Sequence, residues 1–159
     1  LTAAVKNGCD IIKAEEAVRS FNGLEHRMET VRTVNGVKYV NDSISTIPLA
    51  AINAVKTFKA DTLIIGGMDR RINYDILTNF LNGGAVENII CLPDSGYRIA
   101  DTLNTPSNVF RVQNMEEAVL KASEVAKSCC VLSPAAASYG FYKNFEERGR
   151  HFKKLVNLL

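Results

Sequence analysis

The sequence predicts one α/β domain whose sheet is mixed and has about six strands. The first observation is that short apolar segments alternate with amphipathic segments along most of the chain, which is typical of a mostly parallel sheet. The second is that the connections between these segments are short. The third is an Asn-Gly pair between two alternating segments, which indicates an antiparallel hairpin at the start of the domain. Together they predict a Rossmann-like domain with helices on both faces.

The expected elements follow one another in a regular order. Strands at 28–34 and 37–40 form the hairpin, because Asn35 and Gly36 between them both tolerate a positive φ. After the hairpin the pattern predicts helix 49–58, strand 62–65, helix 76–81, strand 88–92, helix 95–103, strand 109–112, helix 115–127, strand 128–132 and a long C-terminal helix. We expect that last helix to present one apolar face made of Phe141, Phe145, Phe152, Leu155 and Leu159.

The first twenty residues differ from the rest. They predict two short helices, at 1–8 and 13–21, and Gly8 is suited to close the first one in a left-handed C-cap. The sequence starts with Leu1 and within a helical pattern, so we expect it to be a piece of a longer protein. Residues 1–20 are therefore interpreted as a lead-in or linker, and residues 21–159 as the domain.

Composition and charge exclude several classes of function. The chain has 159 residues, 23% of them charged, and a formal net charge of +2, which is too small to indicate a nucleic-acid partner. The basic stretch Arg148, Arg150, Lys153 and Lys154 is interleaved with glutamates and is interpreted as a solvated helix face. No apolar run is long enough to insert into a membrane. The four cysteines lack metal-ligand spacing, so we expect buried free thiols.

Polar residues are concentrated where the second strand of the hairpin ends. Asn41, Asp42, Ser43, Ser45 and Thr46 occupy five of six positions before the next helix. One interpretation is a helix start, with hydroxyl caps and Pro48 in the first turn. The other is a ligand site, because five polar side chains exceed what a cap needs. A carboxylate there can accept both hydroxyls of a ribose, and a hydroxyl beside helix amides can hold a carboxylate or phosphate.

Two further loops follow predicted strands. Gly66 to Arg71 places two glycines beside a cation that can grip a carboxylate, and a simple turn with solvated charges is an equally good interpretation. Ser133 to Ser138 is a run of small residues, which predicts either close helix–sheet packing or room for a ligand near the backbone. Open α/β sheets bind ligands at the carboxyl ends of their strands, so these loops are the candidate site.

Several catalytic motifs are absent from the sequence. It contains no P-loop, no dinucleotide fingerprint after the first strand, no His-Glu-x-x-His and no nucleophile elbow. With only His26 and His151, and no cysteine near either in sequence, a Cys/His nucleophile pair has little support. We therefore expect no catalytic residue and no metal ligand in this part of the protein.

The motifs together resemble the C-terminal domain of the Mur ligase family over residues 21–159. The most specific part is the run from Leu132 to Gly149, and it is supported by Gly-Leu-Glu-His-Arg at 23–27 and Asn-Asp-Ser-x-x-Thr at 41–46. The resemblance implies ATP-dependent amide-bond synthesis through an acyl phosphate in bacterial peptidoglycan assembly, in the cytoplasm. It implies glutamate, ATP with Mg and UDP-N-acetylmuramoyl-L-alanine as partners of the full-length enzyme. Residues 1–20 would be the tail of the central ATPase domain, which binds most of the ATP and Mg. The isolated domain is expected to be inactive.

The resemblance also implies roles for individual residues. It assigns ATP contacts to Arg27 and Asp42, the latter on the ribose. It assigns the glutamate pocket to Thr46, Arg70, Ser138, Phe145 and the backbone near Tyr139. In that pocket Thr46 would bind the α-carboxylate and Ser138 the side-chain carboxylate, with Arg70 as the cation between them.

Three departures from the family pattern affect the amino-acid side of the site. Ile44 replaces a lysine, Arg70 replaces the lysine of Gly-Gly-Asp-x-Lys, and the small-residue loop ends in Tyr139-Gly140. D-glutamate is the expected amino acid, and L-glutamate or another amino acid is the alternative. The absence of Asp-Asn-Pro-Arg lowers the case for a diamino-acid ligase. A non-catalytic Rossmann-like module that binds a nucleotide or a protein is the alternative from another class.

Overall fold

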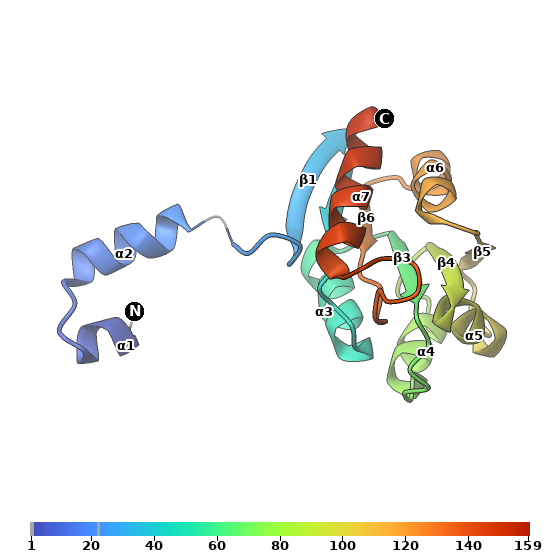
Figure 1. Cartoon of the computed structure of the whole chain (residues 1–159), viewed down its shortest axis with the longest axis horizontal. Helices are drawn as coiled ribbons and strands as arrows, with labels where there is room; N and C mark the ends of the chain where they lie inside the picture. The colour runs from blue at the N-terminus through green and yellow to red at the C-terminus, as the bar shows by residue number, and fades with distance from the viewer. Residues whose placement is uncertain (1, 22) are drawn as a thin grey trace.

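The computed structural model describes every residue except Leu1 and Asn22. It contains one six-stranded sheet in the order β1-β2-β6-β3-β4-β5 (Figure 1). The strands are β1 (Glu29–Val34), β2 (Val37–Asn41), β3 (Thr62–Gly67), β4 (Asn88–Asp94), β5 (Asn108–Arg111) and β6 (Cys129–Leu132). β1 and β2 are antiparallel, and the pairs β2–β6, β6–β3, β3–β4 and β4–β5 are parallel. The predicted mixed sheet is confirmed.

Helices cover both faces of the sheet. The helices are α1 (Thr2–Lys6), α2 (Ile11–Ser20), α3 (Pro48–Phe58), α4 (Asp75–Asn82), α5 (Ser95–Thr102), α6 (Met115–Val125) and α7 (Phe145–Leu158), and α3 to α7 are those that cover the sheet. One core lies between the sheet and α3, α4 and α5, and contains Leu63, Ile65 and Leu77. A second core, on the opposite face, packs α6 and α7 against alternate residues of the same strands, including Ile64 and Ile90. The alternation follows from the two-residue period of a strand.

The hairpin turn has the backbone that its sequence predicts. Asn35 has a φ of 50° and Gly36 a φ of 84°, so both lie in the left-handed region that an Asn-Gly turn requires. The register pairs Val34 with Val37 and Glu29 with Asn41. β2 pairs with β1 on one side and with β6, in parallel, on the other. The carboxyl end of β2 therefore lies next to the carboxyl end of β6.

The two N-terminal helices do not contribute to the core. Neither α1 nor α2 contains a buried residue, and both lie apart from the sheet (Figure 1). The exposed apolar residues of α2 and its C-cap include Ile11, Ile12, Val18 and Phe21. Everything that positions the candidate site therefore lies in the part of the chain from Gly23 onward.

The last helix begins later than its apolar pattern suggests. α7 starts at Phe145, with Asn144 as its N-cap accepting from the Glu147 amide at 2.9 Å. Phe141, which we expected on this helix, lies in the preceding loop and is 48% exposed, and Leu159 ends the chain 40% exposed. The buried face of α7 consists of Arg148, Gly149, Phe152 and Val156. The predicted stripe is confirmed at Phe152 and Leu155, which pack in the core, but was wrong at Phe141 and Leu159, and it missed a buried arginine.

Two predictions from composition also need correction. Arg148 is only 1% exposed, so the basic stretch at 148–154 is not uniformly a solvated face. Cys91, Cys129 and Cys130 are buried free thiols as expected, whereas Cys9 is exposed.

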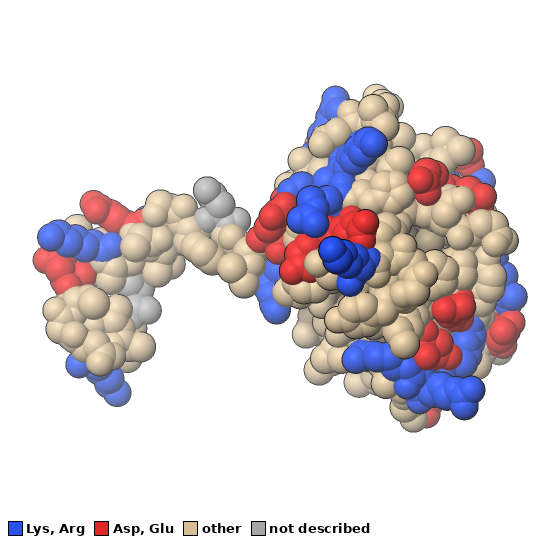
Figure 2. Space-filling view, viewed as in Figure 1, with Lys and Arg blue, Asp and Glu red and all other residues tan. Residues whose placement is uncertain are grey.

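Lysines, arginines and acids intermingle on the face shown in Figure 2. In the described part of the chain, no helix combines the length and apolarity that a bilayer crossing requires.

Asp61 joins two strands at the edge opposite the candidate site. Its carboxylate accepts from the Thr62 hydroxyl at 2.7 Å, from the Ser128 amide and hydroxyl, each at 2.5 Å, and from the Cys129 amide at 3.0 Å. Burial acts to raise the pKa of Asp61, but the hydrogen bonds from Ser128, Thr62 and Cys129 outweigh it and leave that pKa below its ordinary value. The charged carboxylate therefore stabilises the start of β6 against β3.

We expect the stability that Asp61 contributes to be lost in acid. A carboxyl whose pKa is lowered by folding stabilises the protein above its unfolded pKa, about 3.9, and loses that contribution as pH falls through the folded value. Asp61→Asn should therefore be less stable at pH 7 and lose less stability between pH 7 and about pH 3. Urea unfolding followed by circular dichroism checks this, with Glu16→Gln on exposed α2 as the control. An unchanged acid limb in Asp61→Asn would contradict the assignment.

Candidate functional site

The candidate site lies at the carboxyl edge of three neighbouring strands. β6 lies between β2 and β3, so the loops that follow these strands emerge side by side. Thr46 belongs to the loop after β2, Arg70 to the loop after β3 and Ser138 to the loop after β6. This edge is where the strand order reverses, because β6 is inserted between β2 and β3 after the chain has run outward to β5.

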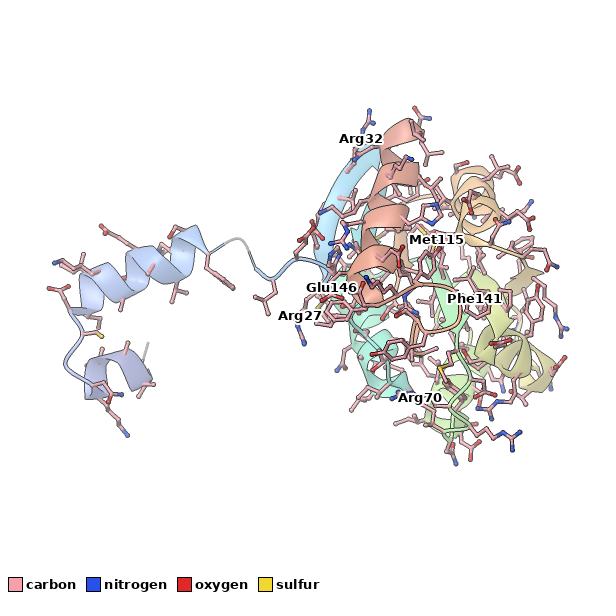
Figure 3. The ribbon with its side chains drawn as sticks, viewed as in Figure 1. Arg27, Arg32, Arg70, Met115, Phe141 and Glu146 are labelled. Carbon is pink, nitrogen blue, oxygen red and sulfur yellow. The ribbon has the colours of Figure 1, made fainter. Side chains whose placement is uncertain are left out.

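Direct contacts connect these loops. Arg70 Nη2 donates to the Thr46 carbonyl at 2.8 Å. The Met68 amide donates to the Ala137 carbonyl at 2.9 Å, which ties the loop after β3 to the residue before Ser138. Arg70 is exposed, Thr46 is half-buried and Ser138 is 3% exposed. The structure thus places a cation and two hydroxyls around one edge, with Arg70 below the loop after β6 in Figure 3.

The loop that carries Arg70 is held by Arg98 of α5. Asp69 Oδ2 accepts from Arg98 Nε at 2.7 Å, and Asp69 Oδ1 accepts from the Arg71 amide at 2.8 Å. Arg98 also donates to the Ile72 carbonyl at 2.9 Å and stacks on Tyr74, 4.8 Å from the ring centre. The solvated cluster proposed for these charges is therefore an ordered frame. It sets the direction in which Arg70 leaves the loop.

A buried arginine organises the floor of the site. Arg148 Nε donates to the Ser43 hydroxyl at 3.0 Å, and its Nη2 donates to the Ser43 carbonyl at 2.8 Å and the Ala136 carbonyl at 3.1 Å. Its Nη1 donates to the Ala137 carbonyl at 3.2 Å. Ser43 Oγ in turn donates to the Phe145 carbonyl at 2.8 Å. Arg148 therefore fastens the loop after β2 and the loop after β6 to the start of α7.

Gly67 makes this close approach feasible. Its φ is 140°, and a Cβ added there would lie 2.6 Å from the Ala137 carbonyl oxygen and 3.0 Å from Arg148 Nη1. No side chain fits in that space without moving the backbone of the loop after β6. The glycine that the sequence suggested for a ligand is thus required first by the protein's own packing.

A second polar network supports the turn before β1. Asn41 Nδ2 donates to His26 Nδ1 at 2.9 Å and to Glu29 Oε2 at 3.1 Å, and its Oδ1 accepts from the Ser43 amide at 3.2 Å. His26 is 2% exposed, and its ring meets the Phe145 ring edge-on at 6.1 Å. Because Nδ1 accepts, the proton of the neutral ring lies on Nε2. Among the described residues, that nitrogen is the buried side-chain atom with no hydrogen-bond partner.

The two predicted nucleotide contacts lie in different environments. Arg27 is exposed beside this turn and next to the start of α7 (Figure 3). Asp42 is 1% exposed, and its carboxylate accepts from the Met28 amide at 3.1 Å and the Ser133 hydroxyl at 2.7 Å. The ribose contact of Asp42 stays a prediction, and it requires a ribose hydroxyl to replace the Ser133 hydroxyl.

The capping interpretation of the polar run after β2 was wrong. The N-cap of α3 is Ile47, and no side chain caps the helix, although Pro48 occupies its first turn as expected. Ser43 instead serves the Arg148 network and Asp42 holds Met28 and Ser133. The run contains more polar side chains than a helix cap needs because Asp42 and Ser43 connect distant loops.

The remaining predicted residues flank the edge. Tyr139 is 60% exposed in the loop after β6, and Phe145 is half-buried at the first position of α7. Glu25, His26 and Glu29 are close enough to hold a metal ion. The Lys153 ammonium already lies 3.1 Å from Glu25 Oε1 and 2.5 Å from Glu29 Oε1, so a cation is provided by the chain itself.

Sequence reasoning missed the organising roles of Arg148 and Arg98. A usable signal existed for Arg148, since it lies four residues before Phe152 on the same helix face and is followed by Gly149. A Cβ on Gly149 would lie 2.2 Å from His26 Nδ1, so the glycine marks a close approach to that face. Arg98 carries no comparable signal in the sequence, whereas Asn41 was noted as part of the polar run after β2.

Comparison with solved structures supports the same fold. UDP-N-acetylmuramate-alanine ligase MurC from Thermotoga maritima has a TM-score of 0.70 and 16% identity, covering 99% of this chain and 36% of that one. MurF ligase from Thermotoga maritima, solved in complex with ADP, has a TM-score of 0.64 and 15% identity, covering 99% of this chain and 37% of that one. No family model matches the sequence.

Curated relatives are similar to this chain over nearly its whole length, and together with the fold they define its class. The chain belongs to the Mur ligase family and corresponds to the C-terminal domain of its members. Its relatives within the family are UDP-N-acetylmuramoylalanine–D-glutamate ligases. The one from Caldanaerobacter subterraneus is 38% identical over 162 residues, covering 98% of this chain and 36% of the relative. The one from Thermoanaerobacter sp. X514 is 41% identical over 146 residues, covering 87% and 32%. The chain spans about a third of the length of these relatives.

Proposed function

We propose that this chain is the amino-acid-binding domain of an ATP-dependent ligase that adds D-glutamate to UDP-N-acetylmuramoyl-L-alanine in peptidoglycan synthesis. The observation that carries the proposal is the Arg70–Thr46 contact at 2.8 Å, with Ser138 on the adjoining loop. A cation and two hydroxyl side chains on neighbouring loops suit a small dicarboxylate. The names of the relatives supply the reaction and the amino acid.

In this proposal the chain's residues position glutamate for attack. Thr46 holds the α-carboxylate, and Ser138, supported by the backbone near Tyr139 and by Phe145, holds the side-chain carboxylate. Arg70 is the cation between them. The glutamate amine then faces outward, toward the domain that carries the acyl phosphate. An arginine can donate two parallel N–H hydrogen bonds to one carboxylate, whereas a lysine ammonium acts as a point charge. Arg70 therefore replaces the usual lysine with a more directional group.

Of the two residues proposed to contact ATP, one is free to do so and the other already has partners within the chain. Arg27 is an exposed guanidinium that can reach a phosphate, whereas Asp42 is occupied by Met28 and Ser133. ATP supplies the phosphoryl group for the acyl phosphate and Mg its charge neutralisation. Both would be held mainly by the central domain, of which residues 1–20 form the tail, while residues 21–159 form the C-terminal domain. The chain by itself is therefore expected to have no ligase activity.

We expect Arg70→Ala, made in the full-length enzyme, to raise the KM for D-glutamate about 10- to 100-fold and leave the KM for ATP within about twofold. Losing a charge-assisted hydrogen-bond pair costs about 1.5–3 kcal/mol. Phosphate release at varied D-glutamate, L-glutamate and ATP measures this. Arg71→Ala is the matched control, because Arg71 is the exposed neighbour in the same loop. A larger effect on ATP than on glutamate would overturn the assignment.

A further inference from the structure

A cavity of about 220 Å³ opens beside the glutamate edge, on the face of the sheet covered by α6 and α7. It lies between the ends of β3 and β4, the start of α6 and the loop after β6. Its lining includes Gly67, Leu92, Gln113, Met115, Phe141 and Arg148, and also Ser138 of the proposed glutamate pocket. In Figure 3 Met115, and Phe141 of the loop after β6, lie to the right of Arg27. The cavity adjoins the proposed glutamate pocket and shares Ser138 with it.

The charge that borders this cavity has no counter-ion within the chain. Arg148 uses four of the five N–H groups that a guanidinium carries, and all of its acceptors are backbone carbonyls or the Ser43 hydroxyl. Among the residues that the structure describes, no carboxylate forms an ion pair with it. The remaining N–H is on Nη1, the atom that faces the Cα of Gly67.

The absence of a side chain at Gly67 leaves space beside Nη1. A Cβ there would lie 3.0 Å from Nη1, and Gly67 and Arg148 both line the cavity. Burial lowers the pKa of Arg148 to about 10, so the group remains protonated at neutral pH. A buried cation without a counter-ion is costly, and a bound anion offsets that cost.

The walls of the cavity restrict what can accompany the anionic group. Leu92 is 6% and Met115 1% exposed, and Phe141 forms part of the rim. A second carboxylate placed against these apolar side chains would lose its hydration without gaining a partner. The volume is below the usual range of small-molecule sites, which limits the ligand to about the size of one ring or a short branched chain.

We propose that this cavity binds a small monocarboxylate with an apolar body, its carboxylate on Arg148 Nη1 and its body against Leu92, Met115 and Phe141. The site goes beyond the proposed function, in which Arg148, Leu92 and Met115 have no ligand contact, although it shares Ser138 with the proposed glutamate pocket. Its ligand would lie beneath the loop that carries Ser138. Occupancy would therefore stiffen one wall of the glutamate edge.

The test titrates the ¹⁵N-labelled chain with benzoate and, as a neutral counterpart of the same shape, benzamide. We expect benzoate to give saturable shifts at the amides of Gly67, Leu92, Asn114 and Met115, and to bind about tenfold or more tightly than benzamide. Phe141→Ala should weaken benzoate severalfold by removing an apolar wall. Gln113→Trp, at the exposed mouth, should abolish the shifts, and its own spectrum reports whether it is folded.

Three outcomes would overturn the proposal. Equal titration by benzoate and benzamide would show that the charge is not recognised. Shifts that do not saturate, or that scatter over surface lysines, would show that there is no site. Displacement of benzoate by D-glutamate from the same amides would show that the cavity belongs to the glutamate site. Failure of Arg70→Ala to alter the KM for glutamate would count against the proposed function and leave this site untouched.

Discussion

Arg148→Ala should lower the free energy of unfolding by about 3–5 kcal/mol. Removing one side of a buried, hydrogen-bonded charge network has an effect of this size because the other side is left unpaired. Three carbonyls, those of Ser43, Ala136 and Ala137, would lose a donor at once, and Ser43 Oγ would lose the Nε–H group. The loop after β6 and the loop after β2 would then separate from α7. The loss would also displace Ser138 from the glutamate edge.

Arg150→Ala provides the matched control for this prediction. Arg150 lies on the same helix, is exposed and carries the same charge, and a surface substitution of this kind changes stability by about 0.5 kcal/mol or less. Chemical unfolding of both variants, followed by circular dichroism, separates the role of the network from the effects of charge and helix propensity. A loss below about 1 kcal/mol in Arg148→Ala would show that the buried network contributes little to the fold.

Gly149→Ala should also destabilise the protein, by about 1–3 kcal/mol, although alanine favours a helix. In an exposed helix the change would gain about 0.5–1 kcal/mol. Here the new Cβ would lie 2.2 Å from His26 Nδ1, so the ring must move. Moving it breaks the 2.9 Å bond from Asn41 and the edge-on contact with Phe145. Overpacking and a lost buried hydrogen bond together exceed the gain in propensity.

The decisive control is the same substitution in a His26→Ala background. With the ring removed, the added methyl group of Gly149→Ala meets no obstacle from residue 26, and the helical preference of alanine should make the substitution stabilising by about 0.5–1 kcal/mol. The sign of the effect should therefore reverse between the two backgrounds. Equal effects in both would show that the glycine is required for a reason other than His26.

The order of strands and helices could be predicted because each rests on local chemistry. The Asn35-Gly36 turn is determined by the tolerance of both residues for positive φ, and the middle residues of β3 and β4 are apolar because both faces of these strands are covered. α7 was placed with the wrong start because Phe141 extends its apolar period backward into a loop. A competing signal, Asn144 with Glu147 three residues later, marks the true start.

Much less of the candidate site could be predicted from local pattern. Thr46, Arg70 and Ser138 were placed at strand ends, but the Arg70–Thr46 contact depends on β6 lying between β2 and β3. Arg148 was interpreted as solvated because it is surrounded by charged residues in the sequence. It is buried because two loops from distant parts of the chain present their carbonyls to it.

The sequence by itself determined the α/β class, the hairpin, the loops that carry the polar residues and the likeness to the Mur ligases. These follow from periodicity, turn chemistry and motif, which act over a few residues. The tertiary structure alone decided that Asp42 and Ser43 are turned inward, that Arg148 is a buried cation with no ion-pair partner among the described residues and that it lines a cavity together with Gly67. The physical reason is that burial and charge compensation are set by groups that lie about a hundred residues apart in the chain, as Ser43 and Arg148 do.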